Sequence, residues 1–138
     1  MSNIQIKHIS WDLNKSFNIS RGSKTTAETI EVQIESNNFY GYGECVPYKR
    51  YDETIDSVTS EINNLKPDIE KGNINLTNLD NFLKNGAARN AIDCAMWDLK
   101  CKMKNTSIWK LMGVKKPTIL PGSLSLIHIS EPTRPNTI

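Results

Sequence analysis

The chain has 138 residues, of which 38% are hydrophobic and 23% are charged, a size and balance typical of one globular domain. Seventeen Lys and Arg against fifteen Asp and Glu leave a net charge of +2, mixed evenly along the chain, which argues against a nucleic-acid partner. The opening MSNIQIKHIS has neither an apolar signal core nor a membrane-length apolar run. We therefore expect no membrane partner and a cytoplasmic location.

The three cysteines also indicate a reducing compartment. Cys45, Cys94 and Cys101 form an odd set, and no two of them have the C-x-x-C spacing of a zinc or redox site. Cys94 and Cys101 lie too far apart along one expected helix to form a disulfide. All three are predicted to be free thiols, as in a reducing compartment.

The first half of the chain alternates between apolar and polar residues. Ile4, Ile6 and Ile9 indicate an opening strand, residues 27–35 have a period of two, and residues 39–45 return after the turn at Asn37-Asn38. Alternation with a period of two is typical of half-buried strands. The pattern predicts a small antiparallel sheet of three strands.

The second half has helical spacing. A helix is expected from Glu53 toward Leu65, capped by Asp52 and ended by Pro67, and a short helix capped by Thr77 follows. The strongest signal runs from residue 87 to about 103, where an alanine-rich stripe would let a neighbouring element approach closely. A short helix begins near Ile108. Strands followed by helices predict an α+β fold.

The final residues differ in character. Residues 124–134 read LSLIHISEPTR, which resembles the translation of a transposon-end adapter used in sequencing libraries. Periodicity alone would also allow a strand here. We expect residues 124–138 to be a non-native, adapter-derived tail and exclude them from fold and function.

Several residues in the native part invite a chemical interpretation. Gly41 and Gly43 suit a strand that packs closely better than a phosphate-binding loop, because no third glycine or helix start follows. Asp93 and Asp98 point in different directions on one helix, so structural hydrogen bonds, for example to Arg89, suit them better than acid–base pairing.

Cations gather in two segments that are expected to be loops joining strands. Arg21 and Lys24 lie in the first segment, and Lys49 and Arg50 lie in the second between Tyr48 and Tyr51. Two such loops can jointly grip an anionic ligand. The alternative is two solvated loops without a ligand.

Three segments carry a family resemblance: residues 19–24 (ISRGSK), residues 41–51 (GYGECVPYKRY) and residues 86–99 (GAARNAIDCAMWDL). Together they resemble the enolase superfamily, in its muconate-lactonizing/mandelate-racemase branch, and within it the L-Ala-D/L-Glu dipeptide epimerases. The match runs from about residue 5 to residue 119. It implies an enolase-like N-terminal capping domain over residues 1–114, a three-stranded antiparallel sheet followed by a helical bundle. Residues 115–123 would begin the first strand of a C-terminal barrel that is otherwise absent.

The resemblance also implies a site. In such enzymes two loops of the capping domain cover the mouth of the barrel, and they correspond to residues 19–25 and 46–52. Arg21 and Lys24 are expected to bind the side-chain carboxylate of a dipeptide substrate. The pocket wall would be formed by Tyr48, Arg50 and Tyr51.

The same resemblance places the chemistry elsewhere. The lysine bases and the ligands of Mg2+ lie on barrel strands in this family, so we expect a Mg2+-dependent parent enzyme in peptidoglycan recycling. This chain is then expected to hold no catalytic residue, to bind no metal and to be inactive alone. A homo-oligomer is left open. Rival interpretations are a muconate cycloisomerase, an o-succinylbenzoate synthase, or a non-catalytic α+β interaction module.

Overall fold

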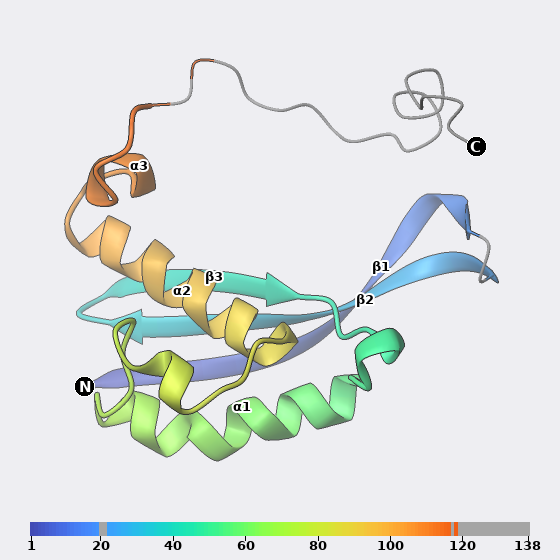
Figure 1. The fold of residues 1–138 in the computed structure, drawn as a ribbon, viewed down its shortest axis with the longest axis horizontal. Coiled ribbons are helices and arrows are strands. Elements are labelled where there is room, and N and C mark those ends of the chain that lie inside the picture. Colours follow the sequence, from blue (N-terminus) through green and yellow to red (C-terminus); the bar gives the residue numbers. More distant parts are fainter. Residues whose placement is uncertain (20–21, 117, 119–138) are drawn as a thin grey trace, which may run out of the picture.

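The protein is described from a computed structural model, which places residues 1–19, 22–116 and 118. The sheet strands come first and the helices follow, as the α+β prediction requires (Figure 1). In chain order the elements are β1 (Ser2–Ile19), β2 (Gly22–Ser36), β3 (Phe39–Cys45), the 3-10 helix η1 (Lys49–Tyr51), α1 (Ile55–Glu70), the 3-10 helix η2 (Leu79–Asn81), α2 (Ala87–Met103) and α3 (Ile108–Leu111). The expected tail and most of the expected barrel-strand start (115–123) lie outside the described residues, which contain no barrel.

The sheet is antiparallel with the order β1-β2-β3. β3 pairs with β2 only as far as Cys45, opposite Ile30. β1 and β2 continue past this point to the pair formed by Ile19 and Gly22, with a register irregularity between Asp12 and Phe17. The extension, residues 9–19 and 22–29, is called the hairpin arm, and it projects beyond β3 (Figure 1). Both strands are thus longer than their hydrophobic alternation predicts.

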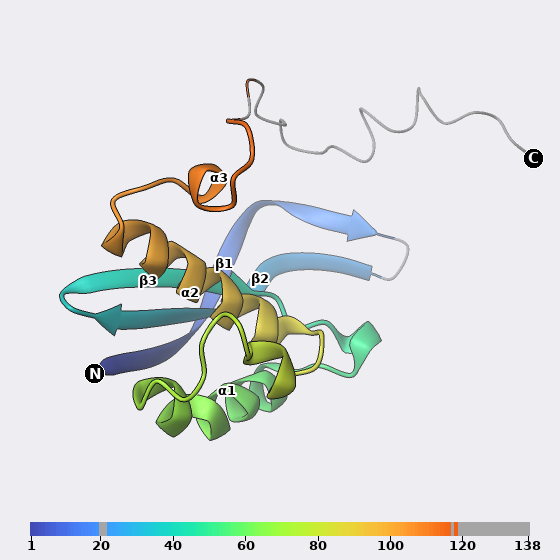
Figure 2. The ribbon, with the colours of Figure 1, turned by 60° about the vertical axis from the view of Figure 1, so that its left-hand side comes forward.

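The helices α1 and α2 cover one face of this sheet (Figures 1 and 2). Alternate strand residues such as Ile4, Val32 and Ile34 are buried there against the helical residues Val58 and Ile92. Residues between them, such as Lys7 and Tyr42, are exposed. The domain is therefore a two-layer sandwich whose core is the helix-facing side of the sheet.

The closest contact in the core joins β3 to α2. A Cβ atom on Gly41 would overlap the carbonyl oxygen of Ala95, and one on Gly43 would overlap that of Ala91. Small residues on both elements therefore let the strand lie directly against the helix backbone. This confirms that the two glycines serve close packing, as the sequence indicates.

Polar side chains of α2 complete the contact at the outer edge of β3. The Tyr42 backbone N–H donates to Asp98 Oδ2 at 2.8 Å. Lys102 donates to the Tyr40 carbonyl at 2.8 Å and to Asp98 at 2.7 Å. Asp98 thus has the structural hydrogen bonds expected of it, whereas Arg89 donates to Asn85 at 2.6 Å rather than to Asp93. Backbone groups on an edge strand are otherwise open to further pairing.

The boundaries of α1 differ from the prediction. Asp52 has a left-handed φ of 57° at the end of η1, and Thr54 caps α1 instead, in a capping box with Ser57. Pro67 lies inside the helix rather than ending it. Proline removes one N–H donor, but the helix continues because Ile69 beyond it is buried in the core.

Of the next two helices after α1, η2 differs from the prediction at its cap and α2 agrees with it. Thr77 does not cap the short helix, since its hydroxyl donates to Asn75 and η2 begins after Asn78. α2 spans the residues that its alanine stripe predicts. Among the described helices, none has the length and apolarity needed to cross a membrane.

We expect Gly43→Ala to destabilise the domain by about 3 kcal/mol, because the new methyl group must push α2 away from β3. Urea unfolding followed by circular dichroism measures the change. Glu44→Ala, at the exposed neighbouring position of the same strand, is the matched control and should change stability little. A loss below about 0.5 kcal/mol for Gly43→Ala would contradict the close-packing interpretation.

The cysteines provide a second test. All three are free thiols; Cys45 and Cys101 are buried and Cys94 is exposed. Burial, and then the charges of Glu53 and Glu44, raise the pKa of Cys45 to about 11. Since the thiolate is the reactive form, alkylation by iodoacetamide at neutral pH should label Cys94 well before Cys45. Mass spectrometry of the peptides checks this order, and equal labelling of the folded chain would contradict it.

Candidate functional site

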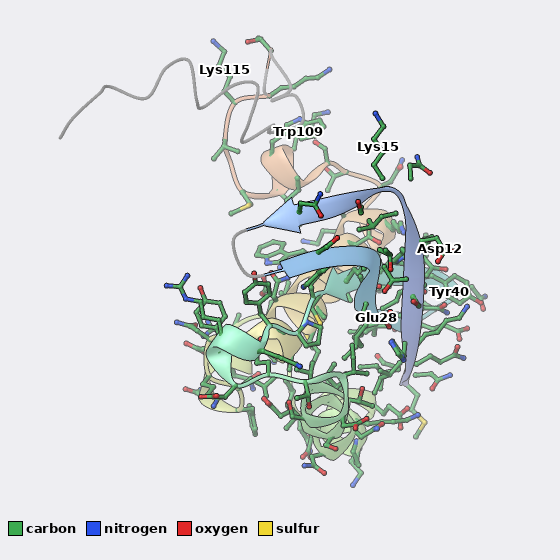
Figure 3. All side chains as sticks on the ribbon, turned by 90° about the vertical axis from the view of Figure 1, so that its right-hand side faces the viewer. Asp12, Lys15, Glu28, Tyr40, Trp109 and Lys115 are labelled. Carbon is green, nitrogen blue, oxygen red and sulfur yellow. The ribbon has the colours of Figure 1, made fainter. Side chains whose placement is uncertain are left out.

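A groove of about 840 Å³ lies between the hairpin arm and the second loop (residues 46–52). Figure 3 views this side of the molecule, with Lys15 and Glu28 labelled on the arm. Strand β3 ends at the buried Cys45, and the chain then leaves the sheet to form the far wall of the groove. The charged residues that line the groove are Lys15, Lys24, Glu28, Lys49, Arg50 and Glu53.

Local hydrogen bonds shape the second loop. The Tyr48 carbonyl accepts from the backbone N–H groups of Tyr51 at 2.9 Å and Glu53 at 3.3 Å. The Asp52 N–H donates to the Lys49 carbonyl at 3.0 Å. Residues 48–53 therefore form a closed turn, in which Tyr48 and Glu53 are half-buried and Lys49 to Asp52 are exposed.

The structure brings two of the expected site residues into contact. The Lys24 ammonium lies 5.3 Å from the centroid of the Tyr48 ring, within the range of a cation–π interaction. Tyr48 in turn lies 6.1 Å from the Tyr51 ring centroid, tilted by 43°. The arm and the second loop thus meet through an amine on one and an aromatic ring on the other.

The remaining expected residues are distributed around this contact. Arg50 lines the groove beside Tyr48. Tyr51, with 68% of its surface exposed, borders an adjacent hollow of about 680 Å³ that Tyr48 also lines. Arg21 lies outside the described residues.

The sequence suggested that both segments are loops joining strands, but their described residues differ from this expectation. Gly22 to Thr25 belong to β2, so Lys24 stands on a strand near the end of the arm. The second segment joins β3 to α1 and contains η1. The difference arises because β1 and β2 keep pairing through a polar stretch whose composition indicates a loop.

Lys15 and Glu53 are groove residues that the sequence did not single out. Lys15 lies at the register irregularity of β1, and an irregularity in pairing leaves no trace in hydrophobic alternation. Glu53 could have been found indirectly. The helix from Ala87 begins after Gly86, without a Ser, Thr, Asp or Asn cap, so its first N–H groups need an acceptor from elsewhere.

The acidic residues of the groove are already engaged. Glu28 bonds to His8 and to Ser10, each at 2.5 Å, and the Ser10 hydroxyl, followed by His8, lowers the pKa of Glu28. Glu53 accepts backbone N–H groups of Tyr48 and Ala87. Four residues that line the groove, Lys15, Lys24, Lys49 and Arg50, carry cationic side chains, against two carboxylates that have partners. This balance of charge suits an anionic ligand.

The described residues contain no group of three or more His, Cys, Asp or Glu side chains that could hold a metal ion. The Mg2+ that the family resemblance implies would be held by barrel strands, which are not among these residues.

Comparisons with known proteins identify relatives of this chain. The L-Ala-D/L-Glu epimerase of Escherichia coli (strain K12) is 38% identical over 117 residues, covering 85% of this chain and 36% of the relative. An N-acetyl-D-glutamate racemase of a Pseudoalteromonas species is 44% identical over 85 residues, covering 61% of this chain and 27% of the relative. The chain thus spans about a third of these relatives.

A solved structure from Agrobacterium tumefaciens shares the fold. It is described as an enolase family member with homology to dipeptide epimerases, with bound sodium and L-Ala-L-Glu and an ordered loop. The match has a TM-score of 0.78 and 36% identity, and it covers 85% of this chain and 35% of the other. The family model for the N-terminal domain of mandelate racemase / muconate lactonizing enzyme matches residues 1–113. The chain therefore belongs to the mandelate racemase / muconate lactonizing enzyme family and carries its N-terminal domain.

Proposed function

We propose that the chain is the substrate-reading N-terminal domain of a dipeptide epimerase of the L-Ala-D/L-Glu type. The observation that carries the proposal is the contact of Lys24 with Tyr48 beside Arg50, on a groove whose carboxylates are already engaged. Lys24, together with Arg21, would bind the side-chain carboxylate of the substrate. Tyr48, Arg50 and Tyr51 would form the wall around it. The epimerase named among the relatives supports this substrate class.

The proposed parent would remove the proton next to a carboxylate and return it on the opposite face of the substrate. Such a proton is weakly acidic, so the developing enediolate needs electrostatic stabilisation, which Mg2+ would supply on the missing barrel. The part of the domain described here would contribute recognition and shielding from water. The free thiols suit action in a reducing cytoplasm.

A second candidate is a racemase of N-acylated glutamate. The relative from Pseudoalteromonas favours it at 44% identity. Both substrates carry a glutamate side chain, so the same cations would serve either one. The groups that differ are the acyl groups on the amino nitrogen of the glutamate, L-alanyl in one substrate and acetyl in the other.

Reading the gene beyond residue 123 discriminates an enzyme from a stand-alone module. A barrel with a Lys-x-Lys strand supports the epimerase, whereas an in-frame stop favours a non-catalytic interaction module. With the parent in hand, turnover of L-Ala-D-Glu, N-acetyl-D-glutamate and muconate separates the candidate reactions.

We predict that the 138-residue chain catalyses no epimerisation of L-Ala-D-Glu, because the proton-transfer groups would stand on the barrel. The measurement is deuterium incorporation at the α-carbon of the glutamate in D2O, followed by proton NMR. The parent enzyme is the positive control and should exchange this proton. Exchange above background by the purified chain alone would contradict the prediction.

In the parent, Lys24→Met is expected to raise KM for L-Ala-L-Glu by about ten- to a hundredfold, because the variant loses one charge-assisted hydrogen bond to the substrate. A dipeptide without a side-chain carboxylate, L-Ala-L-Leu, should not be affected. Lys7→Met, on β1 and outside the groove, is the matched control. An equal loss with both dipeptides would count against recognition of the carboxylate by Lys24.

A further inference from the structure

Glu53 joins two elements that lie far apart in the sequence. Its Oε1 accepts the backbone N–H of Ala87 at 2.8 Å, at the start of α2. Its Oε2 accepts the backbone N–H of Tyr48 at 3.4 Å, in the second loop. One carboxylate thus connects the helix that packs on β3 to the loop that lines the groove.

The position of the Glu53 carboxylate at the start of α2 has a clear physical cause. Gly86 precedes α2 and offers no side-chain cap, and the first turn contains no acidic residue. The open N–H groups and the helix dipole favour a negative charge at this place. A Cβ on Gly86 would lie 2.7 Å from Glu53 Oε1, so glycine leaves the room that the carboxylate occupies.

In the second loop, Glu53 contacts Tyr48, which in turn contacts Lys24. The Tyr48 carbonyl accepts the Glu53 backbone N–H at 3.3 Å, so Tyr48 and Glu53 are tied through both backbone and side chain. The Tyr48 ring lies under the Lys24 ammonium at 5.3 Å. A shift of the Glu53 carboxylate would therefore move Tyr48 and remove the surface against which Lys24 rests.

We propose that Glu53 is the positioning residue of the groove: it holds Tyr48, and through Tyr48 it holds Lys24, in the geometry that reads a glutamate carboxylate. The inference rests on the proposed function for its purpose, but its geometry is independent of any substrate. A carboxylate is required because two N–H donors from two elements need two acceptor oxygens. Glutamine offers one oxygen and would turn an N–H₂ group toward a donor.

The test uses the isotope-labelled 138-residue chain in solution, with Glu53→Gln as the main variant. NMR reports two quantities: the upfield shift that the Tyr48 ring imposes on the Lys24 side-chain methylene protons, and the hydrogen exchange rate of the Tyr48 amide. We expect Glu53→Gln to abolish the shift and to accelerate exchange by about tenfold or more. Amides in the centre of the sheet should keep their exchange rates.

Two further variants make the result specific. Glu44→Gln changes an exposed carboxylate near the end of β3 and should leave both quantities unchanged. Gly86→Ala keeps Glu53 but displaces its carboxylate, and the Gly86 φ of 165° is accessible to any residue. Gly86→Ala should reproduce the effect of Glu53→Gln. If Glu53→Gln fails to fold, Gly86→Ala alone tests whether the Glu53 carboxylate positions Tyr48 and Lys24.

Unchanged Lys24 shifts and Tyr48 exchange in a folded Glu53→Gln would overturn the inference. Collapse of both Glu53→Gln and Gly86→Ala would overturn it too, because Glu53 would then hold the fold rather than the loop. No dipeptide is present in these samples. Their failure leaves the proposed function standing, and failure of the dipeptide kinetics leaves the positioning role standing.

Discussion

The contact between β3 and α2 is the constraint on which the other features depend. Gly41 and Gly43 bring the strand against the backbone of the helix at Ala91 and Ala95, where no side chain separates them. Such an approach fixes the position of the helix along the strand, since any larger residue on either side would force them apart. The start of α2 is thereby held close to the point where β3 ends and the second loop begins.

From that point a short series of contacts leads out of the core. The α2 N-terminus binds the Glu53 carboxylate, the carboxylate binds the Tyr48 backbone, and the Tyr48 ring meets Lys24 on the hairpin arm. The two hydrogen bonds of Glu53 are partly buried, and the contact of Lys24 with the Tyr48 ring lies on the groove beyond them. A rigid centre that carries recognition groups at its margin is how many folds combine stability with a binding site.

The proposed function assigns substrate recognition to this domain and proton transfer to a barrel. The described part of the domain offers cations and aromatic rings facing a groove, and no cluster of metal ligands. Reading an anionic side chain needs little more than that. The relatives include an L-Ala-D/L-Glu epimerase and an N-acetyl-D-glutamate racemase, so this N-terminal domain resembles parts of proteins with different activities. Function thus belongs to the site grafted on the fold and not to the fold alone.

The strands around Val32 and Gly43, the helix over residues 87–103 and the cationic segments could be predicted from the residues alone, because hydrophobic period and local composition report on single elements. The other features depend on contacts between elements that are distant in the sequence. α1 continues past Pro67 because Ile69 reaches the core, and Glu53 acquires its role from Ala87, 34 residues away. Lys24 meets Tyr48 because the arm and the second loop line the same groove. Such pairings depend on where separate elements come together in space, and no local pattern records that.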